Sequence, residues 1–492
     1  MVIMDESKKA QSKRQQTTVG IKIADDWYDV TNFVDRHPGG TLILEYLGRD
    51  ATDMFLAFHL EPARALKRVR KIDGGPPASA VKPEPAGTIE KPHNFEKSWN
   101  GSDDDLARDF RSMLEDLRSE GYFKPGDLTL LLQKVILVAM FLLSSIYLAF
   151  RGTERARFYQ DPDLLEWRRN LIPSALSFAL FLQQSGFLMH DFMHNQWFRN
   201  RKIDQLLGTF FGTVCFGVSS TWWRDEHFMH HAFPNTLEPN RAPKDPQMKE
   251  DVWAQDPKLL QFFDGSIDEA IWTRSLYPLP LRWVNRIINI QAFLWLPLTV
   301  GVGRIGVGIA SLTREPRTSM KILQVFHHSW ILVFLWAAFP TWQSALIFCY
   351  MLSLGQGILH IQLLVSHYER PWQEVQNTKT SAQWYRRQIT STINILPFFS
   401  TRPWRSFDSK TLDIWDECYA PFIDDWFHGG LNLHIEHHLA PTLPRSSLRE
   451  CRRRVRTICK KHNVFYDERH FVQGVWDVLV QMNKVGREAR FS

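Results

Sequence analysis

Four long apolar stretches alternate with polar segments along this chain of 492 residues. In the first of them, residues 128–150, Lys134 is the one charged side chain. About 23 residues at about 1.5 Å each form a helix of about 35 Å, which is long enough to cross a bilayer. We predict four membrane-spanning helices, over residues 128–150, 171–189, 323–339 and 342–365, with a turn at Pro340.

A fifth apolar stretch, residues 287–310, is less regular. It contains Pro297, Arg304 and four glycines, and such residues weaken a helix and would place a charge among lipid chains. We therefore predict a surface or re-entrant element here. The four remaining stretches then form two hairpins, each of which returns the chain to the side of the membrane from which it started.

Eight of the 18 histidines lie in three short clusters, which we call the histidine boxes. Each box contains histidines that lie three or four residues apart, so they can share one face of a helix. The first box directly follows the second predicted span, and an even number of crossings places all three at one membrane surface. The boxes are His190-Asp191-Phe192-Met193-His194, His227-Phe228-Met229-His230-His231 and His434-Ile435-Glu436-His437-His438.

These imidazoles predict a metal site. Imidazole suits iron, copper and zinc, and eight donors exceed what one ion can use, so the boxes predict two ions. Thiolate ligands are not expected, because the five cysteines form no CxxC pair and lie away from the boxes. Any one histidine could instead be held by backbone carbonyl groups. Asp191 and Glu436 could orient the rings by hydrogen bonds, or could be carboxylates on a helix surface.

Residues 19–72 are predicted to form a small soluble domain. A short strand is expected at residues 27–30, and His37-Pro38-Gly39-Gly40 then favours a tight turn that presents His37. His59 follows on a helical, aromatic-rich segment. Two histidines on opposite walls of an apolar pocket can fill both axial positions of a haem, which leaves electron transfer as its role. The stretch resembles cytochrome b5, and the resemblance implies a b-type haem bound by His37 and His59; a haemless remnant of that fold is the alternative.

Three further segments complete the division of the chain. Residues 1–18 form a polar tail without the apolar core of a secretory signal. Residues 73–98 contain five prolines and are expected to form an extended tether that lets the haem domain swing. Residues 103–120 are predicted to form an amphipathic helix with Leu106, Phe110, Met113, Leu114 and Leu117 on its apolar face.

Composition excludes some classes of function. The formal charge of +6 is too small to imply nucleic-acid binding, and no nucleic-acid motif accompanies it. The five scattered cysteines argue against a disulfide framework and favour the reducing side of a membrane.

The boxes and the motifs around them resemble the membrane fatty acyl desaturases, in particular the cytochrome b5-fusion front-end group and its sphingolipid Δ8 relatives. The resemblance implies a multi-domain fold in which a small α+β haem domain is fused to an all-α integral membrane domain, residues 99–492, with four transmembrane helices and a cytosolic di-iron cap. The motifs are Gln183-Gln184-Ser185-Gly186, Trp222-Trp223, Asp425-Trp426-Phe427, Gly429-Gly430-Leu431 and Pro444-Arg445.

Two residues are interpreted through this resemblance. It implies a ninth histidine ligand from the last span, and His367 occupies the matching position, with His360 two turns earlier as its rival. The front-end group usually has glutamine where this chain has His434, whereas other desaturases have histidine there.

The resemblance also implies a reaction. Two hydrogens would be removed from a long, polyunsaturated acyl chain on the carboxyl side of an existing double bond, with O2 as co-substrate and two non-haem iron ions as the metal. Electrons would come through the haem from a cytochrome b5 reductase that uses NADH. The substrate would be an acyl-CoA or a phospholipid, and the protein would be a multi-pass protein of the endoplasmic reticulum with its haem domain and boxes in the cytosol.

Two other classes of function fit parts of the pattern. The first is a fatty acyl or sphingolipid hydroxylase on the same scaffold, which would yield an alcohol instead of an alkene. The second is a membrane-tethered haem protein that only transfers electrons, with the boxes structural or filled with zinc. These patterns do not distinguish acyl-CoA, phospholipid and ceramide carriers, and they carry no signal for the oligomeric state.

Overall fold

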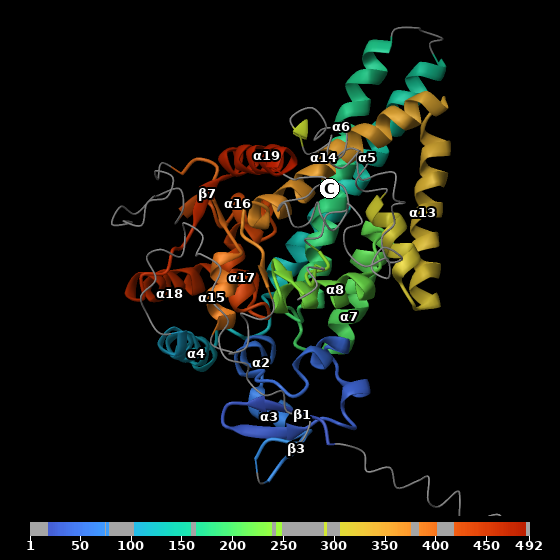
Figure 1. The fold of residues 1–492 in the computed structure, drawn as a ribbon. Coiled ribbons are helices and arrows are strands. Elements are labelled where there is room, and N and C mark those ends of the chain that lie inside the picture. Colours follow the sequence, from blue (N-terminus) through green and yellow to red (C-terminus); the bar gives the residue numbers. More distant parts are fainter. Residues whose placement is uncertain are drawn as a thin grey trace, which may run out of the picture.

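The computed structural model of the protein describes residues 18–73, 75–77, 103–158, 164–238, 243–247, 290–292, 306–374, 383–400 and 418–488. Most of the predicted tether, residues 73–98, and most of the predicted re-entrant element, residues 287–310, lie outside the described residues. In the described part a small domain with a β-sheet packs beneath a larger helical body (Figure 1).

The small domain contains a three-stranded antiparallel sheet in the order β1-β2-β3. The strands are β1 (Gly20–Ile23), β2 (Asp26–Asp29) and β3 (Arg70–Lys71), and Ile21 faces Tyr28 across the first pair. The predicted strand at 27–30 is therefore shifted by one residue. The core is apolar and contains Ile21, Ile23, Val30, Ile43 and Phe55.

Four short helices surround this core. They are η1 (Val34–Arg36), η2 (Gly40–Tyr46), α2 (Thr52–Phe58) and α3 (Pro62–Leu66). His37 ends η1 and His59 ends α2. Both histidines line one cavity.

Among the described residues, four helices are long and apolar enough to cross a membrane, as predicted. They are α5 (Leu128–Phe158), α6 (Leu164–Met193), α13 (Thr318–Ala338) and α14 (Trp342–His367). At their centre Phe178 of α6 stacks on Trp330 and Phe334 of α13, with ring centroids 5.9 and 5.6 Å apart, and meets Phe348 of α14 edge to face.

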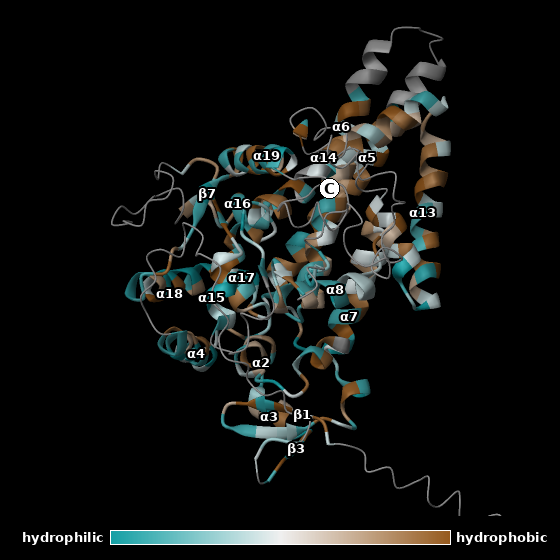
Figure 2. Cartoon of the chain, in the orientation of Figure 1, coloured by the Kyte–Doolittle hydropathy of each residue, from teal (hydrophilic) through white to brown (hydrophobic). Residues whose placement is uncertain are grey.

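The outer faces of these helices are apolar and exposed. Leu143 on α5 and Trp336 on α13 are 65% and 83% exposed, and Figure 2 shows apolar residues along both helices. Exposed side chains of this size are costly in water. A lipid bilayer would cover them.

Shorter elements form a cap at one end of the four helices. Its helices are α4 (Asp103–Ser119), α7 (Arg201–Thr209), the π-helical turn η3 (Phe210–Phe216), α8 (Ser220–Ala232), α15 (Gln383–Thr390), α16 (Asp424–Phe427), η7 (Leu431–Leu433), α17 (His434–Leu439), η8 (Arg445–Ser447), α18 (Leu448–Lys461) and α19 (Phe471–Glu488). Two parallel strand pairs join them: β4 (Thr236–Leu237) with β5 (Gln373–Glu374), and β6 (Asn394–Leu396) with β7 (Glu468–His470).

Helix α4 confirms the predicted amphipathic pattern, because all five residues of its expected apolar face are buried. This helix also holds the small domain against the cap. The Arg111 guanidinium donates to both carboxylate oxygens of Asp53, at 2.6 and 2.9 Å, and Arg118 donates to the carbonyl groups of Leu56 and His59. The small domain is therefore docked on the cap in this structure.

Candidate functional site

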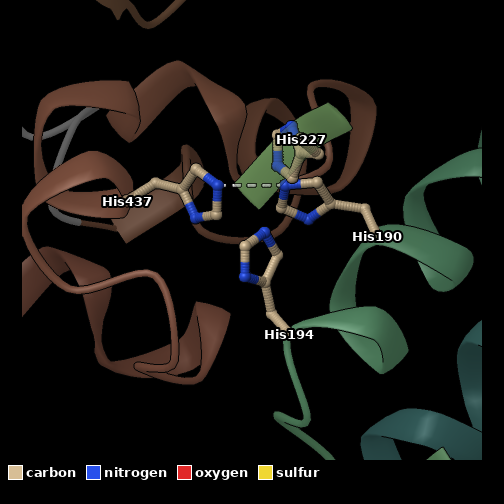
Figure 3. Close-up of side chains that lie close together, drawn as sticks. All are labelled: His190, His194, His227 and His437. Atoms are coloured by element: carbon tan, nitrogen blue, oxygen red, sulfur yellow. Dashed lines mark hydrogen bonds between the residues drawn. The ribbon is translucent and has the colours of Figure 1, made fainter. Parts of the chain in front are cut away.

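Eight buried histidines form two groups of four at the centre of the cap. The first group contains His190 and His194 at the end of α6, His227 on α8 and His437 on α17; Figure 3 shows their rings converging. The second contains His230, His367, His434 and His438. In each group, one possible ligand atom of every residue lies within 4.8 Å of the others.

The second and third boxes divide their histidines between the two groups. On α8, His227 belongs to the first group and His230 to the second; on α17, His437 belongs to the first and His434 to the second. Residues three apart on a helix lie on one face but point in directions that differ by a fraction of a turn. One helix can therefore serve two adjacent metal positions.

His231 lies between the groups. Its Nε2 atom is 3.0 Å from Nε2 of His227, and its ring centroid is 4.3 Å from that of His438. The two groups already include His367. With His231 added, the structure brings together all nine histidines that the sequence predicts for this site. His360, the rival of His367, instead lines an apolar cavity beside the groups.

The spacing of the ring nitrogens fits bound metal ions. Nε2 of His190 is 3.0 Å from Nε2 of His437, and Nε2 of His367 is 2.7 Å from Nε2 of His434. Two nitrogens bound to one ion at about 2.1 Å, at right angles, lie about 3.0 Å apart. Pairs of ligands on one ion therefore account for both contacts.

Four rings are fixed by hydrogen bonds from the nitrogen that points away from the groups. The Nδ1 atoms of His227, His230 and His438 lie 2.7, 2.8 and 2.9 Å from side-chain oxygens of Gln247, Asp245 and Gln388. Nδ1 of His367 lies 2.8 Å from the carbonyl oxygen of Ser391. When Nδ1 donates its proton outward, the lone pair of Nε2 is left for a metal.

Sequence reasoning missed these supporting residues. Asp245 and Gln247 follow the second box within a short segment, and Gln388 lies on α15, so no helical spacing relates them to their histidines. The sequence offered only a chemical signal: the side chains of Asp and Gln carry acceptor oxygens, which can accept hydrogen bonds from histidine rings.

Several ring nitrogens have no hydrogen-bond partner although they are buried. They include both ring nitrogens of His194 and Nε2 of His438. A buried polar atom without a partner costs about 1–3 kcal/mol. One ion in the first group would satisfy Nε2 of His194 and another in the second group would satisfy Nε2 of His438, so the residues present fit two metal ions.

Burial also keeps these rings neutral, as metal ligands must be. Loss of solvent, aided by the neighbouring imidazoles, holds the pKa of the six histidines outside the spans well below its usual value. They are His194, His227, His231, His434, His437 and His438.

The two carboxylates inside the boxes have other partners. Asp191 accepts a hydrogen bond from Arg445 at 2.7 Å, and its oxygen lies 3.6 Å from Nδ1 of His190. Glu436 accepts from Asn394 at 2.8 Å and from the Tyr466 hydroxyl at 2.7 Å, which ties α17 to β6. Asp191 thus lies beside a ring of the site, whereas Glu436 fixes the helix that carries the third box.

The motif that precedes the third box turns the chain sharply. Gly429 and Gly430 have φ angles of +64° and +79°, a region that favours glycine. A Cβ at Gly429 would lie 2.3 Å from the Phe187 ring. The two glycines therefore allow the third box to approach α6 closely.

His37 and His59 both line a mostly apolar cavity of about 800 Å³, whose wall is formed by the small domain and by residues of the cap. Their ring centroids are 6.3 Å apart, and their Nδ1 atoms lie 3.2 and 2.9 Å from the carbonyl oxygens of Gly40 and Phe55. An iron bound at about 2 Å from one nitrogen of each ring would place the ring centres roughly 6 Å apart. The cavity and its histidines therefore fit a haem with two imidazole ligands.

A second apolar cavity, of about 180 Å³, reaches the metal groups from among the spans. His190, His227 and His434 form its inner wall, and Phe187, Phe216 and Leu363 are among its apolar lining residues. A narrow apolar cavity that ends at imidazoles from both groups can present an unreactive hydrocarbon chain to bound metal.

Comparisons with known proteins agree with this geometry. Residues 170–470 match the family described as "Fatty acid desaturase", and residues 6–117 match "Cytochrome b5-like Heme/Steroid binding domain". The first match covers more than half of the chain and includes all three boxes.

Several curated proteins are similar to the chain over nearly its whole length. The "Acyl-lipid (9-3)-desaturase" of Physcomitrium patens is 28% identical over 98% of this chain and 79% of its own. The "Delta(6)-fatty-acid desaturase fat-3" of Caenorhabditis elegans is 25% identical over 91% of each chain, and the "Delta(8)-fatty-acid desaturase" of Euglena gracilis is 27% identical over 93% and 92%. These matches confirm the resemblance to the cytochrome b5-fusion desaturases. The chain belongs to the fatty acid desaturase family: it is a membrane oxidoreductase with a fused cytochrome b5-like domain, which implies a haem, and with histidine groups that suit the di-iron centre of that family.

Proposed function

We propose that the protein introduces a double bond into a long, polyunsaturated fatty acyl chain, on the carboxyl side of a double bond already present. One observation supports this proposal above the others: the apolar cavity is lined by His190, His227 and His434, which come from both metal groups. The names of the relatives, which are acyl-lipid (9-3)-, Delta(6)- and Delta(8)-desaturases, support the front-end position. The proposed carrier is an acyl-CoA or a phospholipid.

Each group of four histidines is proposed to hold one iron ion, with His231 available between them. When bound, the two ions would supply the oxidising power, drawn from O2, that removal of two hydrogens from a hydrocarbon chain requires. The protein's own residues do the rest. Asp245, Gln247 and Gln388 orient the rings, and the buried position of all nine histidines excludes water from the reacting carbons.

The two carboxylates of the boxes are proposed to position this site. Asp191 holds Arg445 beside α6, and Arg445 in turn approaches the Phe187 ring of the apolar cavity. Glu436 keeps α17 against β6 through Asn394 and Tyr466. Loss of either carboxylate would let a ligand-bearing helix shift.

Electrons are proposed to pass directly from the haem domain to the metal groups. Phe58, which precedes His59, meets Phe228 and His231 edge to face, with ring centroids 5.6 and 6.0 Å apart. His194 of the first group also lines the haem cavity. The supply of electrons to the haem is assigned to a cytochrome b5 reductase that uses NADH, and the location to the endoplasmic reticulum with the haem domain in the cytosol.

Lipid analysis of a yeast host tests this function. Cells that express the protein are fed defined polyunsaturated fatty acids, and their lipids are compared by mass spectrometry with those of cells that express His437→Ala. The control is His462→Ala, a histidine outside both metal groups that contacts Asp109. We expect a product with two hydrogens fewer from wild type and His462→Ala only. A hydroxylated product would support the hydroxylase alternative, and a product on ceramide the sphingolipid Δ8 alternative.

A further inference from the structure

Arginines from both domains line the haem cavity, and those of them that are exposed, Arg64, Arg68 and Arg201, lie at its mouth. Arg64 and Arg68 come from α3 and the chain after it, whereas Arg199 comes from the segment that joins α6 to α7 and Arg201 is the first residue of α7. The rest of the cavity wall is mostly apolar, with Ile23, Val30 and Phe55 among its residues. The two domains thus meet around one opening, and both contribute positive charge to it.

Within the described part of the chain, these arginines do not all have an ion pair or a full set of hydrogen-bond acceptors. Arg64 is paired with Glu61 at 3.1 Å. Arg199 donates to the carbonyl groups of Asn195 and Thr442, at 2.7 and 2.8 Å, but its Nε atom is buried without a partner. A buried N–H group without a partner, such as that of Arg199 Nε, indicates an acceptor that the protein itself does not supply.

Arg201 and Arg68 are the least balanced of the four. Among the described residues neither forms an ion pair, and the charges that act on Arg201 are those of Arg224 and Arg68, which are also cations. Like charges gathered in one place repel each other. Arg201 lines the same cavity as both proposed haem ligands, His37 and His59.

We propose that Arg68 and Arg201 bind the two carboxylate groups of the haem, so that residues of both domains hold it. This inference rests on the proposed haem ligation by His37 and His59. Haem b is an apolar ring that carries two carboxylates at one edge. An apolar cavity with two histidines inside and unbalanced arginines at its mouth complements that distribution of charge.

Two consequences follow. The haem would act as a ligand common to both domains and would stabilise the docked arrangement, in addition to the Arg111–Asp53 pair of α4. Cations beside the carboxylates would also favour the reduced haem, which carries one more negative charge than the oxidised haem. Removal of an arginine should therefore lower the reduction potential of the haem.

The test uses the full-length, haem-loaded protein in lipid nanodiscs. The variants are Arg68→Gln, Arg201→Gln and the double variant. Lys67→Gln and Lys202→Gln are matched controls, because each lysine is the exposed neighbour of one arginine and lines no part of the cavity. Two quantities are measured: the reduction potential of the haem, and the rate at which the haem transfers to excess apomyoglobin. Neither readout depends on desaturase activity.

We expect each arginine variant to lose haem roughly three- to tenfold faster than wild type, which is the effect expected when a partly exposed charge-assisted contact is lost. Each variant should also have a lower reduction potential of the haem. The lysine controls should match wild type. The measurements are then repeated with haem dimethyl ester, in which both carboxylates are blocked. Wild type and the arginine variants should now behave alike.

Two results would overturn the inference. In the first, the arginine variants match the lysine controls with ordinary haem. In the second, the difference between wild type and Arg201→Gln persists with the dimethyl ester, which would mean that the arginines act on the protein fold. If His37 and His59 do not bind the haem, the result is different: the wild-type protein itself would lack the absorption spectrum of a haem with two imidazole ligands.

Discussion

The ring of Phe58 in the haem domain meets the ring of His231 in the second histidine box edge to face, with centroids 6.0 Å apart. The same phenyl ring is adjacent in sequence to His59 and packs on Phe228 of α8. One aromatic side chain therefore connects a proposed haem ligand with the proposed di-iron site, and the docking of the two domains determines its position.

This contact gives a first prediction. Phe58→Ala should slow oxidation of the reduced haem by the desaturase site, because the contact between the domains is lost; an aromatic pair contributes about 0.5–1.5 kcal/mol. Stopped-flow spectroscopy at the haem absorption band, with substrate and O2 present, measures the rate. Because Phe58 also lines the haem cavity, the rate is compared per bound haem. Non-haem iron content should stay unchanged, as should the rate in the control Leu56→Ala on the same helix. Wild-type rates in Phe58→Ala would exclude this route.

The division of the histidines into two groups gives a second prediction. His437→Ala removes a residue of the first group and His230→Ala one of the second, so each variant should lose iron chiefly from one position and should have no turnover. Iron per haem, measured by elemental analysis and absorption, should fall in both, while the protein remains folded in the membrane. Full iron content or full activity in either variant would contradict the assignment of two metal ions.

The supporting residue Asp245 gives a third prediction. Its carboxylate lies 2.8 Å from Nδ1 of His230 and also accepts from the backbone N–H of Asn235 at 2.9 Å. Asp245→Ala should weaken metal binding about 10- to 100-fold, the usual effect of losing such a partner, and Asp245→Asn should do so less. Competition with a chelator measures the affinity. The exposed Asp116 provides a control, Asp116→Ala; equal effects of both substitutions would argue against a specific role.

His434 gives a fourth prediction, because the front-end group usually has glutamine at this position. Its Nε2 atom lies 2.7 Å from Nε2 of His367, and the amide oxygen of a glutamine could reach a similar place as an acceptor. His434→Gln should keep measurable desaturation at the same double-bond position, whereas His434→Ala should abolish it. Should the glutamine variant lose iron and activity as completely as the alanine variant, His434 would be an obligatory imidazole ligand.

The local features of the site were predictable from the sequence. Spacings of three and four residues brought the histidines of each box to one helix face, and those spacings are intrinsic to a helix. The apolar face of α4 and the turn at Pro340 between α13 and α14 also followed from local pattern. The first span was predicted to end at residue 150, and the part of α5 that is apolar enough to cross a membrane ends at Arg151. The helix itself continues to Phe158, because backbone hydrogen bonds and not hydropathy determine where a helix stops.

Contacts between distant segments were not predictable. Gln388 meets His438 from α15, and Arg111 meets Asp53 from another domain, and neither pair shares a periodic pattern. His367 was nominated through the family resemblance alone. Its place beside His230 and His434 depends on how α14 crosses the cap, which is a property of tertiary packing.

We infer that the two histidine groups hold two iron ions next to a single haem. Mössbauer spectroscopy of full-length protein, purified from cells grown on isotopically enriched iron, tests it most directly, because the areas of the signals count non-haem and haem iron in one sample. We predict two non-haem irons for each haem, with the non-haem signal lost from a variant that lacks both His230 and His437. A signal from haem iron alone, with zinc or no metal in the histidine groups, would contradict the assignment of two iron ions to these groups.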